Sequence, residues 1–197
     1  NYMGYPASTG TPGVDFRIVD STTDPVASAG TAGADALASE RLIRIDPCFL
    51  CYRPPQEAPA VAPSPCQKTG AITFGSFNVL DKVSEATLDA WAEVLKRVPS
   101  ARLLLKTKPL VDPKVRERVI HAFASRGVEA SRLELMGWAE GVRGHLELYS
   151  RIDIALDTFP YNGTTTTCEA LWMGVPVVAF KGPVHASRVG ASLVSTV

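Results

Sequence analysis

The 197 residues are enough for one large domain or two small ones, and a content of 46% hydrophobic and 20% charged residues is ordinary for a globular protein. The 20 basic and 20 acidic side chains cancel, so no overall positive field favours a nucleic acid or an anionic membrane as partner. No apolar run approaches the roughly 18 residues that a membrane span needs.

Residues 1–52 alternate between short strand-like segments and turns. The segments Phe16–Val19 and Leu42–Ile45 are each followed by an aspartate, which is typical of a strand that ends at a turn. The stretch 21–38, rich in Ala, Thr and Gly, is predicted to be a loop, with a helical turn near 34–40. Two strands are too few to form a core, so we expect the end of a first Rossmann-like lobe, in a fragment of a longer protein.

Residues 53–70 contain five prolines. Each proline fixes φ and removes a backbone N–H donor, so neither a helix nor a central strand is expected here. We predict an extended linker between two lobes, with Pro54–Pro65 lacking regular structure.

From Ala71 onward, strand-like and helix-like segments alternate. Ser84 is a suitable N-cap for one helix, and Asp112 followed by Pro113 begins another. This alternation predicts an α/β fold, with a parallel, doubly wound sheet of about five strands joined by helices. The expected strands are 71–74, 101–105, 132–136, 152–156 and 175–180, and the expected helices are 84–97, 113–126, 144–150, 168–173 and 185–193.

The four cysteines are Cys48, Cys51, Cys66 and Cys168. The spacing of Cys48 and Cys51 occurs in metal and redox sites, but a zinc site needs about four ligands and the chain has no second pair. We therefore expect free thiols, no bound metal and no disulfide between Cys48 and Cys51. Such thiols persist in a reducing compartment, so we expect a cytoplasmic protein.

The segment Asp157–Pro176 joins two predicted strands through a Pro/Gly turn, four consecutive threonines and a short helix. A loop that leaves the carboxyl end of a parallel strand and begins a helix is where open α/β sheets bind ligands. The helix N-terminus offers free N–H groups to a phosphate, Gly163 permits close backbone approach, and Glu169 could hold a ribose diol. The alternative is an ordinary Thr-rich helix cap without a ligand.

Four segments resemble the O-GlcNAc transferase family, the SPINDLY-like protein glycosyltransferases, in its bacterial form. They follow the family's order along nearly the whole chain, which makes the resemblance more specific than any one of them. The four segments are Gly4–Gly10, Phe74–Lys82, Pro160–Pro176 and His185–Ser192.

This resemblance implies a GT-B-type glycosyltransferase. Residues 1–52 would be the end of the N-terminal catalytic lobe, 53–70 the linker, and 71–197 the Rossmann-like C-terminal lobe that binds a nucleotide sugar. The implied activity is inverting transfer of N-acetylglucosamine from UDP-GlcNAc to Ser and Thr hydroxyls of a protein acceptor, without a metal or other cofactor. Helical TPR repeats often precede this catalytic region in the family, and the oligomeric state stays open.

The resemblance also implies roles for individual residues. Lys82 would bind the diphosphate and stabilise the leaving group, because an ammonium offsets the negative charge that develops there. The family's candidate base, a histidine, would lie upstream of Asn1. The other implied contacts are Ala139 and Thr164 at the uracil, Thr165 and Thr166 at the diphosphate, Glu169 at the ribose, His145 on the nucleotide, and Gly4 and Tyr161 near the sugar.

Several of these positions differ from the animal members of the family, so the donor sugar stays open. Thr164 stands in place of a histidine, Glu169 of an aspartate, Val79 of a glutamine, and Tyr161 of a small residue. The alternatives are a transferase that uses another donor such as UDP-glucose, and a non-catalytic nucleotide-binding module.

Three further residues have structural alternatives. Taken alone, Lys82 is compatible with a solvated surface charge and His145 with a helix-start histidine that bonds locally. The segment His185–Arg188 is predicted to start the last helix and to brace the loop, without a catalytic role.

Overall fold

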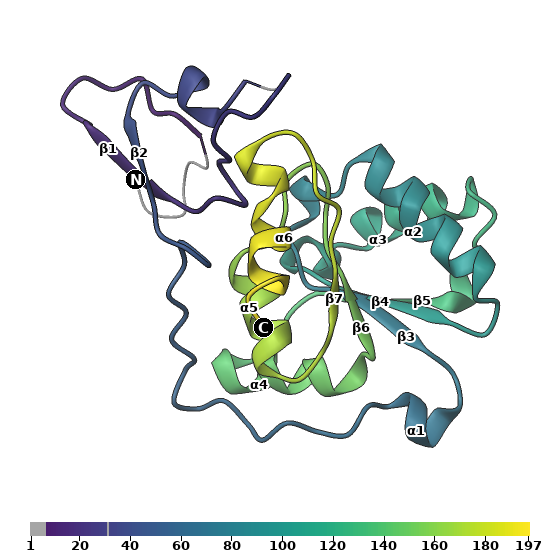
Figure 1. Ribbon diagram of the computed structural model, residues 1–197. Helices are drawn as coiled ribbons and strands as arrows, with labels where there is room; N and C mark the ends of the chain where they lie inside the picture. The colour runs from purple at the N-terminus through teal and green to yellow at the C-terminus, as the bar shows by residue number, and fades with distance from the viewer. Residues whose placement is uncertain (1–6, 31) are drawn as a thin grey trace.

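The computed structural model describes residues 7–30 and 32–197, which form a small two-stranded sheet and a larger five-stranded domain (Figure 1). Between them, the chain runs along the outside of the larger domain before it enters the central sheet (Figure 1). The predicted sugar-proximal residue Gly4 lies outside the described residues.

The larger domain is built on a parallel sheet with the strand order β5-β4-β3-β6-β7. The chain adds strands on one side of β3 and then crosses to its other side, so the topological switch point lies between β3 and β6. The predicted α/β fold with about five parallel strands is confirmed. The strands are β3 (Thr73–Ser76), β4 (Arg102–Lys106), β5 (Leu133–Met136), β6 (Ile154–Leu156) and β7 (Val177–Val178).

Helices cover both faces of this sheet. Leu103 packs on the side of α2 and α3, whereas Leu104 packs on the side of α4 and α5, and both side chains are 0% exposed. Burial of each contributes about 1.5–3 kcal/mol to folding. The helices are α2 (Glu85–Arg97), α3 (Pro113–Ala124), α4 (Gly141–Glu147), α5 (Thr165–Trp172) and α6 (Val189–Val194), with 3-10 turns η2 (Leu80–Lys82), η3 (Lys108–Val111), η4 (Ala130–Arg132), η5 (Leu148–Arg151) and η6 (His185–Ser187).

The predicted helix starts at Ser84 and Asp112 are confirmed. The Ser84 hydroxyl accepts a hydrogen bond from the N–H of Thr87, and the Asp112 carboxylate accepts one from the N–H of Lys114. Each bond satisfies an N–H that the first turn of a helix leaves free.

Three helices and the linker differ from the predictions. The predicted last helix, 185–193, is the 3-10 turn η6 followed by α6, which begins at Val189. Helix α5 begins at Thr165 rather than 168, and α4 begins at Gly141 rather than 144. Pro54–Pro65 has no regular structure, as predicted, but the linker ends in a short helix, α1 (Cys66–Thr69), which is a correction. The Asp153 carboxylate accepts hydrogen bonds from the N–H of Cys66 and the hydroxyl of Ser64, so a tertiary contact holds the start of α1.

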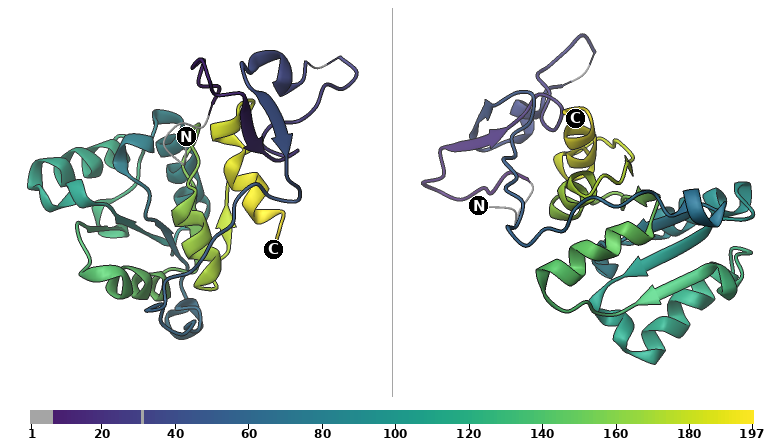
Figure 2. Two further views of the ribbon diagram at one scale, coloured as in Figure 1. Left: turned by 90° about the vertical axis from the view of Figure 1, so that its left-hand side faces the viewer. Right: turned by 90° about the horizontal axis from the view of Figure 1, so that it is seen from below.

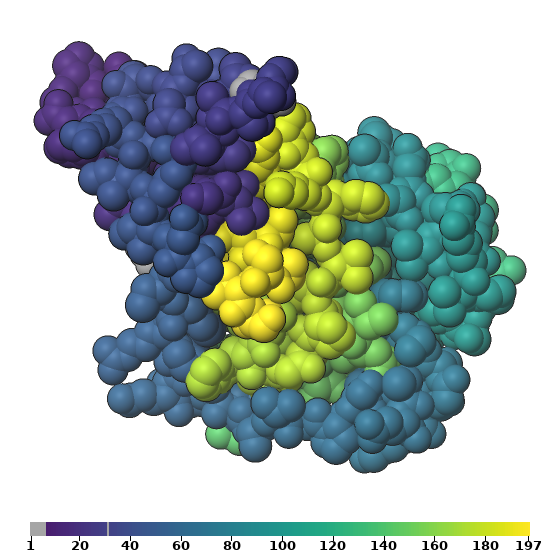
Figure 3. Space-filling view, in the orientation of Figure 1, coloured from purple at the N-terminus to yellow at the C-terminus, as the bar shows by residue number. Residues whose placement is uncertain are grey.

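The small sheet consists of parallel strands β1 (Phe16–Val19) and β2 (Arg41–Arg44), joined through the 3-10 turn η1 (Ala34–Leu37). It lies against α6, which separates it from the central sheet (Figures 2 and 3). The hydroxyl of Ser192 donates a 2.5 Å hydrogen bond to the Asp20 carboxylate across this boundary. An apolar cluster of α5 and α6 residues also packs on the segment after β2, including Phe49 and Leu50.

Candidate functional site: a threonine-lined helix start and a cavity beside the small sheet

The loop between β6 and α5 is held by one buried carboxylate. Asp157 Oδ1 accepts hydrogen bonds from the backbone N–H of Thr158 (2.8 Å) and Gly163 (2.6 Å), and from Asn78 Nδ2 (3.2 Å). Burial raises the pKa of Asp157 to about 6, although these hydrogen bonds and the charge of Lys82 lower it. The loop is therefore fixed to the end of β3 as well as to β6.

Gly163 is required by packing. A Cβ atom there would lie 2.6 Å from Thr166 Oγ1 and 2.9 Å from Asn78 Oδ1, closer than real Cβ atoms come to other atoms. Because Gly163 has no side chain, Thr166 and Asn78 can pack directly against its backbone. The predicted approach to a ligand stays a prediction.

The four threonines have different surroundings. Thr164 is the N-cap of α5 but makes no side-chain cap, and Thr165 is exposed. Thr166 Oγ1 donates to Asn78 Oδ1 (2.9 Å), and Thr167 is buried. An exposed Thr165 and a first turn without a side-chain cap are compatible with an anion site at this helix N-terminus.

Lys82 lies on the other side of the same loop. Its Nζ donates to the carbonyl oxygen of Asn162 (3.0 Å) and lies 4.1 Å from the centre of the Tyr161 ring. Burial lowers the pKa of Lys82, and the nearby Asp157 carboxylate opposes this effect. The residue is a half-buried cation beside the start of α5, and the reading as a solvated surface charge does not fit.

A second polar cluster lies further along α5. His145 Nε2 is 2.9 Å from Glu169 Oε2, and His145 Nδ1 is 3.0 Å from Lys106 Nζ. The hydroxyl of Tyr149, a single donor, lies 3.2 Å from Glu169 Oε2 and 3.1 Å from the carbonyl oxygen of Thr166, which joins this cluster to the start of α5. His145 is therefore part of an inward-facing network.

Lys106 is a polar residue of the site that the sequence analysis did not name. It is the last residue of β4, and burial lowers its pKa while the Glu169 carboxylate raises it. Its position at the carboxyl end of a predicted strand was the signal that could have identified it.

Ala139 follows β5 at the same sheet edge. The ring of its neighbour Trp138 lies 6.0 Å from Lys106 Nζ and 5.8 Å from Lys108 Nζ, and is 64% exposed. Among the described residues, no side-chain hydrogen bond joins Ala139 to the other predicted contacts. The loop and α5 connect most of the predicted contacts, namely Lys82, His145, Thr164–Thr166 and Glu169. Ala139 is linked to this group less directly, because its neighbour Trp138 lies beside Lys106.

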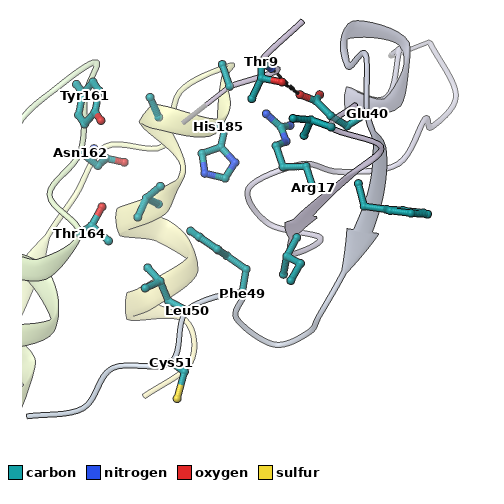
Figure 4. Close-up of a pocket in the computed structure, with 16 residues that line it drawn as sticks. Thr9, Arg17, Glu40, Phe49, Leu50, Cys51, Tyr161, Asn162, Thr164 and His185 are labelled. Atoms are coloured by element: carbon teal, nitrogen blue, oxygen red, sulfur yellow. Dashed lines mark hydrogen bonds between the residues drawn. The ribbon is translucent and has the colours of Figure 1, made fainter. Parts of the chain in front are cut away.

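A cavity of about 450 Å³ lies between the small sheet and the loop (Figure 4). Tyr161, Thr164 and His185 line it from the larger domain, and Arg17, Glu40 and Phe49 are among the residues that line it from the small sheet and the segment after it. Hydrogen bonds from the Thr9 hydroxyl and N–H lower the pKa of Glu40 to about 2. The predicted sugar-proximal Tyr161 thus borders a cavity shared by both parts of the chain.

The segment after β7 braces the loop, as predicted. The N–H of Asn162 donates to the carbonyl oxygen of Ala186 (2.9 Å), and Asn162 Oδ1 accepts from the N–H of Gly190 (3.2 Å).

The cysteines are free thiols, and within residues 7–30 and 32–197 no cluster of three or more His, Cys, Asp or Glu side chains could hold a metal.

Comparison with known sequences decides the family. The sequence profile described as Glycosyl transferase family 41 matches residues 66–197. The chain belongs to glycosyl transferase family 41. The predicted resemblance to the O-GlcNAc transferase and SPINDLY-like proteins is therefore confirmed.

Two relatives of this family 41 chain come from Arabidopsis thaliana. "Probable UDP-N-acetylglucosamine--peptide N-acetylglucosaminyltransferase SPINDLY" is 44% identical over 196 residues, which cover 100% of this chain and 21% of the relative. The corresponding protein SEC is 28% identical over 201 residues, covering 98% of this chain and 20% of the relative. The chain thus spans about a fifth of the length of the curated relatives it matches.

A solved structure supports the fold of the family 41 chain. A mutant of the O-GlcNAc transferase of Thermobaculum terrenum matches with a TM-score of 0.86 and 38% identity, covering 97% of this chain and 35% of that one. The predicted GT-B-type fold is confirmed by this match. No helix in the described part of the chain is both long enough and apolar enough to cross a membrane.

Proposed function

We propose that this chain is part of an inverting glycosyltransferase that moves N-acetylglucosamine from UDP-GlcNAc to Ser and Thr hydroxyls of proteins. The observation that carries the proposal is the position of Lys82 Nζ, 3.0 Å from the Asn162 carbonyl oxygen and beside the uncapped start of α5. A cation and a helix N-terminus that meet at one loop form an anion site suited to a diphosphate. The names of the relatives support the choice of donor and of a peptide acceptor.

The chemistry follows from this placement. The acceptor oxygen forms a bond to the anomeric carbon, and the bond from that carbon to the diphosphate oxygen breaks, with its electron pair leaving on UDP. Lys82 and the N–H groups of the first turn of α5 would offset the charge that develops on the leaving diphosphate. We propose that the reaction needs no metal or other cofactor, because these groups supply positive charge themselves.

The nucleoside would lie along α5. Thr165 and Thr166 would begin the helix at the diphosphate, and Glu169 comes one turn later along α5. We propose that Glu169 holds the ribose while His145 orients its carboxylate, and that Ala139 and Thr164 border the base. In this arrangement, the cavity beside Tyr161 would receive the sugar.

We also propose the division of the chain and its location. Residues 1–52 would be the end of an N-terminal catalytic lobe, 53–70 a linker, and 71–197 the nucleotide-sugar-binding lobe. Nucleotide sugar and protein acceptor would meet between the lobes, in the cytoplasm.

A second candidate function is transfer from another nucleotide sugar, such as UDP-glucose. The observation that favours it is Tyr161, whose ring borders the cavity where a small residue would leave more room. A third is a nucleotide-binding module without turnover.

The experiment is a donor panel with the full-length protein. Release of the nucleotide and glycosylation of a peptide library are measured with UDP-GlcNAc, UDP-glucose and sugars carried on other nucleoside diphosphates, each with and without EDTA. We expect transfer from UDP-GlcNAc that EDTA does not abolish. Transfer from a different donor alone would support the second candidate, and UDP binding without any transfer would support the third.

A further inference from the structure

The cavity between the small sheet and the loop contains an imidazole with a fixed orientation (Figure 4). His185, the first residue of η6, places Nδ1 2.5 Å from Asp24 Oδ2, and its ring packs edge-on against Phe49 with the ring centres 5.3 Å apart. Asp24 lies in the segment that connects β1 and β2, so the two parts of the chain hold one side chain between them.

Asp24 is held as a carboxylate. Burial raises its pKa, but the hydrogen bond with His185 and the charge of Arg17 are among the effects that outweigh burial, and the pKa is lowered overall. Its other oxygen, Oδ1, accepts from Arg17 Nη2 at 2.7 Å. A carboxylate can only accept hydrogen bonds, so the Nδ1 of His185 carries the proton. In the neutral ring, Nε2 then has a free lone pair.

The Nε2 of His185 is unused within the part of the chain that the structure describes. No hydrogen bond reaches it from residues 7–30 or 32–197, and the side chain keeps 11% exposure while it lines the cavity. The next residue, Ala186, accepts the N–H of Asn162, whose own carbonyl oxygen accepts from Lys82 Nζ. The residue next to His185 is therefore hydrogen-bonded to the loop that carries the proposed diphosphate site.

We propose that His185 is a catalytic residue that removes the proton from the acceptor hydroxyl, and that Asp24 is its positioning residue. This inference rests on the proposed function. As the acceptor oxygen bonds to the anomeric carbon, its proton passes to His185 Nε2, and the electron pair of the breaking carbon–oxygen bond leaves on the diphosphate. Asp24 fixes the ring and stabilises the imidazolium that forms. The base would then lie within this chain, whereas the family resemblance places a histidine before Asn1.

The competing explanation is that the Asp24–His185 pair only ties the small sheet to the larger domain. The experiment therefore compares two nucleophiles in the full-length protein. A peptide hydroxyl must lose a proton, whereas azide is an anion that needs no base. For His185→Ala, we expect transfer to peptide to fall by about 100-fold or more, with unchanged UDP affinity and with formation of the glycosyl azide retained. Asp24→Asn keeps an oxygen for Nδ1 but loses the charge, so peptide transfer falls less.

Ser192→Ala is the matched control, because it removes the Asp20–Ser192 bond across the same boundary and leaves the imidazole in place. We expect it to leave the ratio of peptide to azide transfer unchanged. Equal losses with both nucleophiles in His185→Ala, or no loss with either, would overturn the role of His185 while leaving the proposed function standing. A wild-type protein that binds UDP but transfers sugar to neither nucleophile overturns the proposed function, and this role with it.

Discussion

Lys82 Nζ and the carbonyl oxygen of Asn162 lie 3.0 Å apart, so the cation at the end of the 3-10 turn η2 is held against the loop that begins α5. We predict that Lys82→Ala lowers sugar transfer by the full-length protein by about 100-fold or more, the scale of losing one preorganised donor at a developing negative charge. The measurement is kcat for nucleotide release together with UDP affinity. Lys114→Ala, which removes an exposed lysine from α3, is the control and should change neither. Normal turnover and normal UDP affinity in Lys82→Ala would show that the diphosphate lies elsewhere.

Two adjacent threonines should respond differently to loss of the hydroxyl. Thr165 is exposed, so Thr165→Val should lower UDP affinity by at most about tenfold, the worth of a neutral hydrogen bond, without lowering stability. Thr166→Val leaves the buried Asn78 Oδ1 without its donor and should lower the free energy of unfolding by about 1–3 kcal/mol. UDP titration and chemical denaturation of both variants distinguish the two roles. The reverse pattern, with the stability loss in Thr165→Val, would contradict this assignment.

The sequence was sufficient to predict the parallel sheet, because each strand and helix carries its own local signal. Ser84 and Asp112 begin helices where expected, since a cap is a property of a few neighbouring residues. The start of α5 was placed three residues late, because threonine is a weak helix former. A contact distant in the sequence, between Thr166 and Asn78, outweighs that preference.

Contacts between residues distant in the sequence also explain why parts of the site could not be predicted. Lys106 has no motif around it, and its place beside His145 depends on how β4 and α4 pack. The Asp24–His185 pair joins residues 161 positions apart, and no local pattern predicts such a contact. Gly163 is predicted to let a ligand approach, whereas the structure gives it a steric role that depends on Asn78, two residues after β3.

Ionisation of Asp157 should lower the free energy of unfolding as the pH rises from about 4 to 7. Its pKa in the folded protein is about 6, above the ordinary 3.8, so the folded state holds the proton more tightly than the unfolded chain. The resulting stabilisation is complete below pH 3.8 and is lost as the pH rises through 6. It amounts to at most about 3 kcal/mol. The measurement is the free energy of unfolding of wild type minus that of Asp157→Asn, across this range.

Asp153→Asn is the matched control for this pH dependence. Burial raises the pKa of Asp153, but hydrogen bonds from Ser64, Thr73 and Cys66 outweigh burial and lower it overall. The stabilisation of the fold by Asp153 is therefore present above the ordinary pKa of 3.8 and is lost as the pH falls below it. This pH dependence is opposite in sign to that expected for Asp157. A flat difference between wild type and Asp157→Asn would mean that folding does not shift the pKa of Asp157.

Glu169 provides a test of where the nucleoside lies. Its carboxylate is held by His145 (2.9 Å) and Tyr149 (3.2 Å), so its position is fixed before any ligand binds. If it accepts the ribose hydroxyls, Glu169→Gln should weaken UDP binding by about tenfold or more, because a hydrogen bond to a charged acceptor is worth more than one to a neutral amide. Pyrophosphate has no ribose, so its affinity should stay unchanged. Calorimetry with both ligands makes the comparison, and Glu147→Gln, which alters an exposed carboxylate paired with Arg143, is the control. Equal weakening of UDP and pyrophosphate would place Glu169 at the diphosphate or in a purely structural role, because a ribose contact cannot affect a ligand without a ribose.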